Sequence, residues 1–202
     1  MSYKIDYFFS VMSPWSYFGD ARLRTIAAQH GVAVEHKPVD SKVIFSRTGG
    51  LALKDRSKER QAYRMRELKR WSARLGININ FAPQHYPVSS DDAARVIIAA
   101  RQMGADVSLL THALMQAVWV EERNVADHDV LDSVLREQGL AADEMLRSAA
   151  GAGVENEYRE NTETAIAHGV FGVPAYVFKD DLLWGQDLSL IHISEPTRRY
   201  AI

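Results

Sequence analysis

The first forty residues restrict the fold of this chain more than any other segment, because they encode a strand, a helix and a second strand with little loop between them. Residues 4–9 alternate in polarity and are rich in aromatic side chains, which is typical of a strand. Ser13 and Pro14 then supply a helix N-cap and a proline at the first helical position. The helical pattern ends at Gly31, and residues 32–39 are patterned as a second strand. A strand–helix–strand unit of about 35 residues predicts two parallel strands in one sheet.

The middle of the chain is patterned for helices, and strand character returns only near its end. After a predicted loop, "SRTGGLALKD", apolar residues recur at helical spacing in several segments, namely 57–75, 90–100, 107–118, 130–135 and 154–168. The runs "VPAYVFKDD" and "LLWG" then predict an antiparallel hairpin. This order resembles an α/β, thioredoxin-like fold, in which a β-α-β start and a β-β finish enclose a large inserted helical domain. We expect a discontinuous thioredoxin-like domain at 1–40 and 169–187, and the inserted domain at 41–168.

The chain of 202 residues contains no cysteine, which excludes disulfide exchange, thiolate metal sites and cysteine nucleophiles. Apolar residues make up 47%, charged residues 25% and the net charge is -2, a balance that predicts neither a nucleic-acid nor a membrane partner. The seven histidines never stand two, three or four residues apart, so we predict no metal site. No signal-peptide pattern and no apolar run of about 18 residues is present, so we expect a cytoplasmic protein.

Two short motifs could carry chemistry. Ser13 lies at a helix N-terminus, where unpaired backbone N–H groups and the helix dipole favour an anion, although Ser-Pro alone predicts only a helix cap. The second motif is "GVFGVPAY", in which Pro174 begins a strand. A cis bond before Pro174 would turn the Val173 backbone outward and offer strand-like hydrogen bonds to a peptide, but spacing alone leaves cis and trans open. The two motifs in this order are more specific than either one alone.

Together with four further motifs, these residues resemble a known family. "SPWSY", "GGLALKDR", "RQAYRMRELKRW", "AVWVEERN", "GVFGVPAY" and "WGQD" are similar to the 2-hydroxychromene-2-carboxylate isomerases. These are relatives of the kappa-class glutathione transferases, so the resemblance implies a DsbA-type thioredoxin fold. The resemblance covers residues 3–187. It implies a glutathione-dependent isomerase that performs the cis/trans ring-opening isomerisation of 2-hydroxychromene-2-carboxylate in aromatic-compound catabolism, through a transient glutathione thiolate adduct. Glutathione would thus supply the sulfur that this chain lacks.

The resemblance gives Ser13 the role of stabilising the glutathione thiolate. Lowering a thiol pKa from about 8.5 by about two units requires roughly 2.7 kcal/mol, which a charge-assisted hydrogen bond of about 1.5–3 kcal/mol and the helix dipole can provide. Asp187 would pair with the free amine of the γ-glutamyl end. The full set of glutathione contacts implied by the resemblance is Ser13, Trp15, Val173, Pro174, Trp184, Gly185, Gln186 and Asp187. Without the resemblance, Trp184 would be interpreted as a core aromatic and Asp187 as a turn residue.

An aromatic carboxylate substrate requires a cation and apolar walls. The resemblance places its contacts at Phe45, Lys54, Asp55, Arg56, His85 and Tyr86. For Lys54 and Arg56 a solvated loop charge remains an alternative, as does a structural role for His85. Between Lys54 and Arg74 the chain has nine basic and three acidic residues, a pattern that favours a solvated helix face whose positive field attracts anionic glutathione and substrate.

Two other functions remain compatible with the sequence. A kappa-like glutathione transferase or peroxidase would use the same glutathione subsite with a different pocket at Phe45, Lys54 to Arg56 and Tyr86. A redox-inactive thioredoxin-fold module would instead hold an extended peptide at the Val173–Pro174 edge. The resemblance also suggests a homodimer.

The last fifteen residues, "LSLIHISEPTRRYAI", do not continue the preceding pattern. In the family that the chain resembles, the aspartate corresponding to Asp187 is followed by a C-terminal helix that packs on the sheet. We therefore interpret residues 188–202 as foreign or frameshifted sequence, with an irregular native terminus as the alternative.

Overall fold

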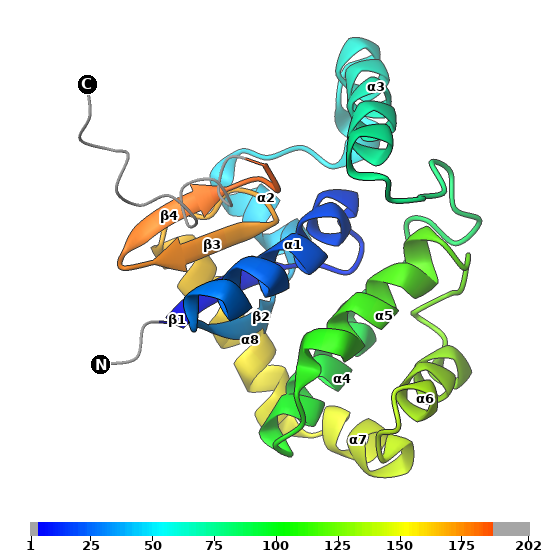
Figure 1. The fold of residues 1–202 in the computed structure, drawn as a ribbon, viewed down its shortest axis with the longest axis vertical. Helices are drawn as coiled ribbons and strands as arrows, with labels where there is room; N and C mark the ends of the chain where they lie inside the picture. Colours follow the sequence, from blue (N-terminus) through cyan, green and yellow to red (C-terminus); the bar gives the residue numbers. More distant parts are fainter. Residues whose placement is uncertain (1–3, 188–202) are drawn as a thin grey trace.

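A four-stranded mixed sheet forms the centre of the protein (Figure 1). The computed structural model describes residues 4–187. The strand order is β2-β1-β3-β4, and the strands span Lys4–Phe9 (β1), Ala33–Pro38 (β2), Ala175–Phe178 (β3) and Asp181–Trp184 (β4). β1 and β2 are parallel, with Ile5 opposite Val34, whereas β3 is antiparallel to both β1 and β4. The predicted strand–helix–strand unit and the terminal hairpin are confirmed.

Helices connect these strands, most of them between β2 and β3. Within the described residues they are α1 Pro14–His30, α2 Ser41–Thr48, the 3-10 turn η1 Leu53–Asp55, α3 Lys58–Leu75, α4 Asp91–Gln102, α5 Val107–Trp119, α6 His128–Glu137, α7 Ala142–Ala149 and α8 Ala152–Ala167. Several begin at an aspartate whose carboxylate accepts a backbone N–H of the first turn, as Asp40, Asp106 and Asp127 do. The predicted order, in which a helical segment is followed by two C-terminal strands, is therefore present.

Two segments differ from the sequence pattern. The predicted loop at 46–55 contains the end of α2 and the turn η1. The Asp40 carboxylate starts α2 by accepting the N–H groups of Lys42 and Val43 at 2.8 and 3.3 Å, and only Ile44 of this helix is buried. The apolar pattern also does not predict α7, which has eight residues. Helices of two turns show too few apolar repeats for their period to be recognised.

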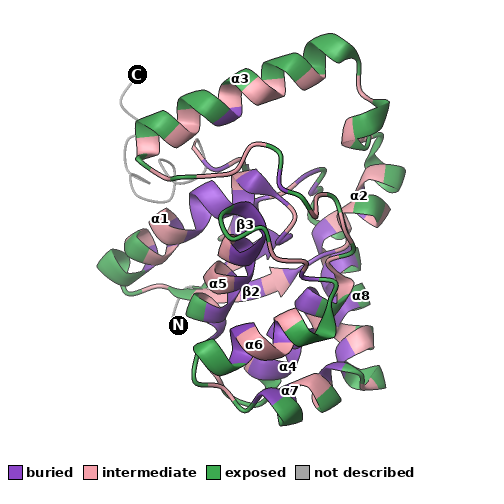
Figure 2. Cartoon of the chain, turned by 90° about the vertical axis from the view of Figure 1, so that its right-hand side faces the viewer, coloured by how far each residue is buried: buried purple, intermediate pink, exposed green. Residues whose placement is uncertain are grey.

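The alternation of side chains along β1 builds a core on each face of the sheet. Tyr7 and Phe9 pack in the larger core with α1, α4 and α5, while Phe8 packs on the opposite face with Ile44 of α2 and Ala165 of α8. Figure 2 shows the buried residues concentrated at the sheet and on the inner sides of these helices. The helices α2 and α8 thus pack directly on the sheet. The division of the chain into domains at 1–40 with 169–187, and 41–168, stays a prediction.

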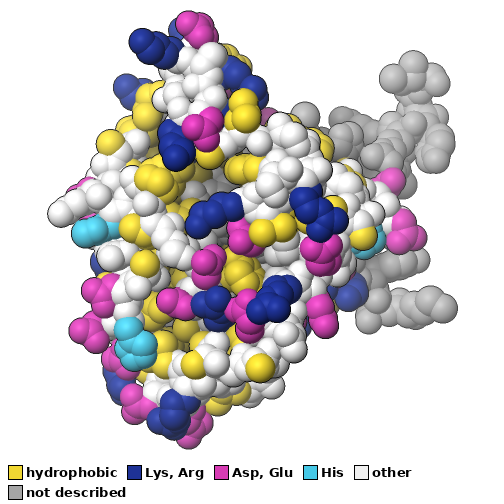
Figure 3. Space-filling model, turned by 180° about the vertical axis from the view of Figure 1, so that it is seen from behind, with side chains coloured by type: hydrophobic (Ala, Val, Ile, Leu, Met, Phe, Trp, Pro, Cys, Tyr) yellow, Lys and Arg dark blue, Asp and Glu magenta, His cyan; other side chains and the backbone are white. Residues whose placement is uncertain are grey.

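Helix α3 protrudes from this body. It packs against α1, and Leu68 is its only buried residue. Seen from behind, Lys and Arg side chains gather over α3 at the top of the molecule (Figure 3). The predicted solvated basic face is therefore the surface of one projecting helix.

The described part of the chain excludes the anomalous tail. Residues 188–202, which we interpret as foreign or frameshifted sequence, lie outside the described residues, as do residues 1–3. Within residues 4–187, none of the helices combines the length and the apolar character required to cross a lipid bilayer.

His36 predicts a pH dependence of stability. It is 3% exposed, lies edge-on to the rings of Tyr7 and Phe9, and its Nε2 atom has no hydrogen-bond partner among the described residues. Burial lowers the pKa of His36, although the carboxylate of Asp20 raises it in part. Because an unfolded histidine has a pKa of about 6.5, the unfolded chain takes up this proton first as the pH falls. The stability that the neutral, buried His36 contributes is thus fully present above about pH 6.5 and is lost as the pH falls below that value.

We expect the thermal midpoint of the wild type to decrease when the pH is lowered from 7.5 to 5.5. The decrease should be smaller in the variant His36→Phe. The other titrating groups are the same in both proteins, so the difference between the two slopes isolates His36. Equal slopes would show that His36 is protonated as easily in the folded chain as in the unfolded one.

Candidate active site

Ser13 caps the helix that follows β1. Its side-chain oxygen accepts the N–H of Ser16 at 3.2 Å, and its carbonyl accepts the N–H of Tyr17 at 3.1 Å. The Ser13 N–H in turn donates to the carbonyl of Ser10 at 2.9 Å, which closes the turn between β1 and α1. The predicted cap with Pro14 at the first helical position is confirmed. This local chemistry fixes the Ser13 hydroxyl at the positive end of α1, where it is 8% exposed.

The Val173–Pro174 segment meets Ser13 across the fold. The Ser13 hydroxyl donates to the carbonyl of Val173 at 3.3 Å, and the Val173–Pro174 peptide bond is cis. The carbonyl of Pro174 accepts the N–H of Gly185 at 3.0 Å, which ties this segment to the end of β4. Ser13 and Val173, two predicted site residues that are 160 positions apart in sequence, are therefore adjacent in the structure.

The first turn of α1 leaves one donor available for an anion. Pro14 has no N–H, and the N–H groups of Ser16 and Tyr17 are occupied by Ser13. The N–H of Trp15 has no hydrogen-bond partner within residues 4–187. The first turn of α1 also contains no acidic residue. The Ser13 hydroxyl and the Trp15 N–H are thus the two groups that can donate to a thiolate at this helix end.

An exposed aromatic pair borders the Val173–Pro174 segment. Trp184 and Phe171 are 51% and 46% exposed, and their ring centroids are 4.8 Å apart. The indole of Trp184 covers Gly172, because a Cβ atom at Gly172 would lie 3.0 Å from the indole nitrogen. Trp184 is therefore a surface aromatic rather than the core residue that the sequence alone would favour, and it is available to contact a ligand.

The turn after β4 packs against α1. Gln186 is 2% exposed, and its side-chain amide has no hydrogen-bond partner among the described residues. A Cβ atom at Gly19 would lie 3.2 Å from the Cβ of Gln186 and 2.8 Å from the Tyr176 hydroxyl, so the close approach of α1 to this turn requires glycine. Asp187 is partly buried. The contacts of Gly185, Gln186 and Asp187 with glutathione stay predictions.

Residues from the helical segment between β2 and β3 also lie near the start of α1. The indole of Trp119 donates to the carbonyl of Val11 at 3.0 Å, two residues before Ser13. The ring of Tyr86 packs on Trp119 with centroids 4.9 Å apart, and the N–H of Asn80 donates to the Trp119 carbonyl at 2.7 Å. Trp119 thus connects the loop that carries Tyr86 to the turn that carries Ser13. Sequence reasoning missed this role, although Trp119 lies within the motif "AVWVEERN".

The other residues predicted to contact the substrate are not all gathered around Ser13. The guanidinium of Arg56 lies 5.9 Å from the ring centroid of Phe45 and donates to the carbonyl of Leu51 at 2.9 Å. Lys54 and Asp55 are exposed in η1, and His85 is partly buried beside Tyr86 in sequence. No described contact joins Lys54, Asp55 or His85 to Ser13, so their roles stay predictions.

A buried carboxylate supports α1 behind Ser13. The side chain of Asp20 is fully buried and contacts Nδ1 of His112 at 3.0 Å and Nε of Arg24 at 3.3 Å. Tyr7 lies close by, with its hydroxyl donating to the carbonyl of Ser16 at 3.5 Å. Burial raises the pKa of Tyr7, and the negative charge of Asp20 raises it further, so the phenol remains a hydrogen-bond donor. These contacts hold the first two turns of α1 against the sheet and α5.

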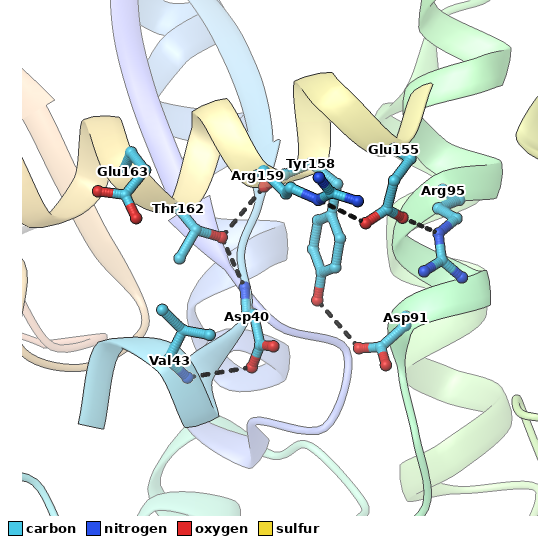
Figure 4. Close-up of a pocket in the computed structure, with 9 residues that line it drawn as sticks. All are labelled: Asp40, Val43, Asp91, Arg95, Glu155, Tyr158, Arg159, Thr162 and Glu163. Atoms are coloured by element: carbon cyan, nitrogen blue, oxygen red, sulfur yellow. Dashed lines mark hydrogen bonds and ion pairs between the residues drawn. The ribbon is translucent and has the colours of Figure 1, made fainter. Parts of the chain in front are cut away.

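A separate cavity of about 470 Å³ lies between α2, α4 and α8 (Figure 4). None of the predicted site residues lines it. Its polar groups have partners: Glu155 accepts from Arg95 and Arg159, the Tyr158 hydroxyl donates to Asp91 at 3.2 Å, and Glu163 pairs with Arg47. Because these groups already have partners, we place the candidate active site at Ser13 and not in this cavity.

Several known proteins are similar to this chain over most of its length. The chain is 29% identical over 191 residues to a 2-hydroxychromene-2-carboxylate isomerase of Sphingobium xenophagum, covering 93% of this chain and 94% of that protein. It is 24% identical to a kappa 2 glutathione S-transferase of Caenorhabditis elegans, covering 84% and 78% of the two chains. A solved structure of a 2-hydroxychromene-2-carboxylate isomerase superposes with a TM-score of 0.77 at 24% identity, covering 96% of this chain and 95% of that one.

The DSBA-like thioredoxin domain matches residues 4–189, which include all the strands and helices described above. The α/β fold predicted from the order of strands and helices is thereby confirmed. The chain belongs to the DSBA-like thioredoxin domain family.

Proposed function

We propose that this protein is a glutathione-dependent isomerase of 2-hydroxychromene-2-carboxylate. The observation that carries the proposal is the meeting of the Ser13 hydroxyl and the Val173 carbonyl at the positive end of α1, in a chain without cysteine. A member of the DSBA-like family without its own thiol retains a site suited to the thiol of another molecule. The full-length similarity to isomerases of this substrate supports the same reaction class.

The residues at this site fit a bound tripeptide thiol. The Ser13 hydroxyl and the Trp15 N–H would donate to the sulfur, and the Val173 backbone would hold the cysteinyl part. Trp184, Gly185, Gln186 and Asp187 would contact the γ-glutamyl end. Bound glutathione would supply the nucleophilic sulfur that the chain itself lacks. To donate to that sulfur, the Ser13 hydroxyl has to turn away from the Val173 carbonyl, which frees that carbonyl to accept from the ligand backbone.

The aromatic substrate would bind on the opposite side of Ser13. Tyr86 is held on Trp119, close to the 10–13 turn, and offers a flat apolar wall. Phe45 and Arg56 supply a second ring and a cation for the substrate carboxylate. Orientation of the ring against a fixed thiolate is the main contribution of these residues to the rate.

The first test measures isomerisation of 2-hydroxychromene-2-carboxylate by absorbance, with and without added glutathione. We expect turnover only with glutathione, because no side chain of the protein can replace its thiol. Turnover at the same rate without glutathione would contradict the proposal. Heat-inactivated protein with glutathione serves as the control for the uncatalysed reaction.

A kappa-like glutathione transferase is the second candidate, and the similarity to a kappa 2 transferase favours it. It would use the same contacts at Ser13 and Val173. Conjugation of an aryl halide, or reduction of an organic peroxide, in the absence of chromene-acid turnover would support this second candidate over the first.

A further inference from the structure

Arg64 differs from every other basic residue of α3. The helix carries Lys58, Arg60, Arg64, Arg66, Lys69, Arg70 and Arg74, and all of them except Arg64 are exposed. Arg64 is partly buried and lies four residues before Leu68, so both side chains share the face of α3 that turns toward the body of the protein. The side chain of Arg64 therefore does not belong to the solvated basic face.

The surroundings of Arg64 are those of the predicted substrate pocket. Gln61, one turn before Arg64 on the same side of α3, donates its side-chain amide to the Arg56 carbonyl at 2.8 Å, and Leu68 and Tyr86 pack in the same hydrophobic core. Burial lowers the pKa of the Arg64 guanidinium, the charge of an ionised Tyr86 would raise it, and the positive charge of Arg56 lowers it. Two residues predicted from the sequence to contact the substrate are thus within electrostatic range of Arg64. One comes from the loop before α4 and the other from the loop before α3.

Arg64 has no compensating partner within residues 4–187. It makes no ion pair, hydrogen bond or ring contact there, whereas Arg95, Arg101 and Arg123 each pair with two acidic side chains. A partly desolvated guanidinium within electrostatic range of a second one is destabilised, and an anion bound near both would relieve this repulsion. The arrangement is therefore complementary to a carboxylate.

We propose that Arg64 binds the carboxylate of the anionic aromatic substrate, together with Arg56 and between the rings of Tyr86 and Phe45. The proposal rests on the proposed function and names a contact that the sequence motifs do not indicate. A guanidinium can hold a carboxylate by two parallel hydrogen bonds and fix the orientation of the attached ring. Glutathione also carries a carboxylate at its glycyl end, so the experiment has to distinguish the two carboxylates.

The test compares Arg64→Gln with Arg60→Gln, which removes an exposed arginine from the same helix. The probes are cinnamate, an unreactive aromatic carboxylate, and its neutral amide, both measured by titration calorimetry on the full chain saturated with glutathione. We expect cinnamate to bind about 10- to 100-fold more weakly to Arg64→Gln, the size typical of a lost charge-assisted contact. The amide should bind equally to wild type and variant. Arg60→Gln should stay within about twofold of wild type for both probes, since its charge is exposed and screened.

Two further measurements separate binding from folding. The thermal midpoint of Arg64→Gln should equal or exceed that of the wild type, because the variant removes an unpaired, partly buried charge. Arg64→Lys should recover part of the cinnamate affinity, because it keeps the charge and loses the paired hydrogen bonds. A lower thermal midpoint of Arg64→Gln, with unchanged cinnamate affinity in the folded protein, would overturn the proposal.

The remaining outcomes distinguish the two proposals. Equal weakening of cinnamate and glutathione in Arg64→Gln would assign Arg64 to the glycyl carboxylate and overturn the substrate contact. Failure of cinnamate to bind the wild type would overturn it as well. Isomerisation that depends on glutathione and is unchanged in Arg64→Gln would leave the proposed function standing without Arg64. Loss of cinnamate binding in Arg64→Gln, in a wild type that does not isomerise the chromene acid, would support the Arg64 site and contradict the proposed function.

Discussion

Alanine at position 13 is expected to lower the rate of glutathione-dependent isomerisation about 10- to 100-fold near neutral pH. The hydroxyl of Ser13 can give a thiolate a charge-assisted hydrogen bond of about 1.5–3 kcal/mol. Without it, the pKa of the bound thiol rises by one to two units toward about 8.5, so less thiolate is present at neutral pH. The loss should shrink as the pH is raised, because the thiol then ionises without help. A pH profile of kcat/KM in wild type and Ser13→Ala measures this shift.

Ser16→Ala is the matched control for this variant. Ser16 lies one turn further along α1, is fully buried, and its hydroxyl has no hydrogen-bond partner among the described residues. We expect its rate and thermal midpoint to stay close to wild type. Ser13→Ala also removes a helix cap, at a cost of about 0.5–2 kcal/mol, so the assay has to be run well below its thermal midpoint. A rate for Ser13→Ala equal to that of Ser16→Ala at every pH would remove Ser13 from the mechanism.

Trp119→Ala is expected to lower the free energy of unfolding by about 3–5 kcal/mol. Trp119 is 1% exposed, its indole donates to the Val11 carbonyl, and the ring of Tyr86 packs on it. The substitution leaves a large cavity and an unsatisfied carbonyl next to the turn that positions Ser13. Urea unfolding followed by circular dichroism measures the change.

Two milder variants separate packing from the hydrogen bond. Trp119→Phe keeps most of the ring and loses the bond to Val11, so we expect a loss of about 1–3 kcal/mol together with weaker binding of the aromatic substrate. Val120→Ala changes the neighbouring residue, which is 39% exposed, and should alter stability by less than about 0.5 kcal/mol. A loss for Trp119→Ala as small as that for Val120→Ala would show that the indole does not support this region.

The strands and most helices were predictable because local sequence specifies them directly. The alternation in β1, the cap at Ser13 and the hairpin around Lys179 each depend on residues within a few positions of one another. The short helices α2 and α7 were missed because two turns hold too few apolar positions to show a period. The candidate site was only partly predictable: Arg64, which we propose as a substrate contact, looks like its basic neighbours in the sequence, and only its partial burial distinguishes it.

The sequence by itself determined the order of the strands and helices, the cap at the start of α1 and the absence of any cysteine thiol. Those properties follow from residue type and spacing along the chain. Only the tertiary structure decided that Ser13 meets Val173, that Trp119 joins the Tyr86 loop to the Ser13 turn, and that Arg64 has no side-chain partner among residues 4–187. These contacts join residues up to 160 positions apart, and they depend on how the helices pack on the sheet. No local propensity encodes that packing, because it is set by the fit of side chains from distant segments.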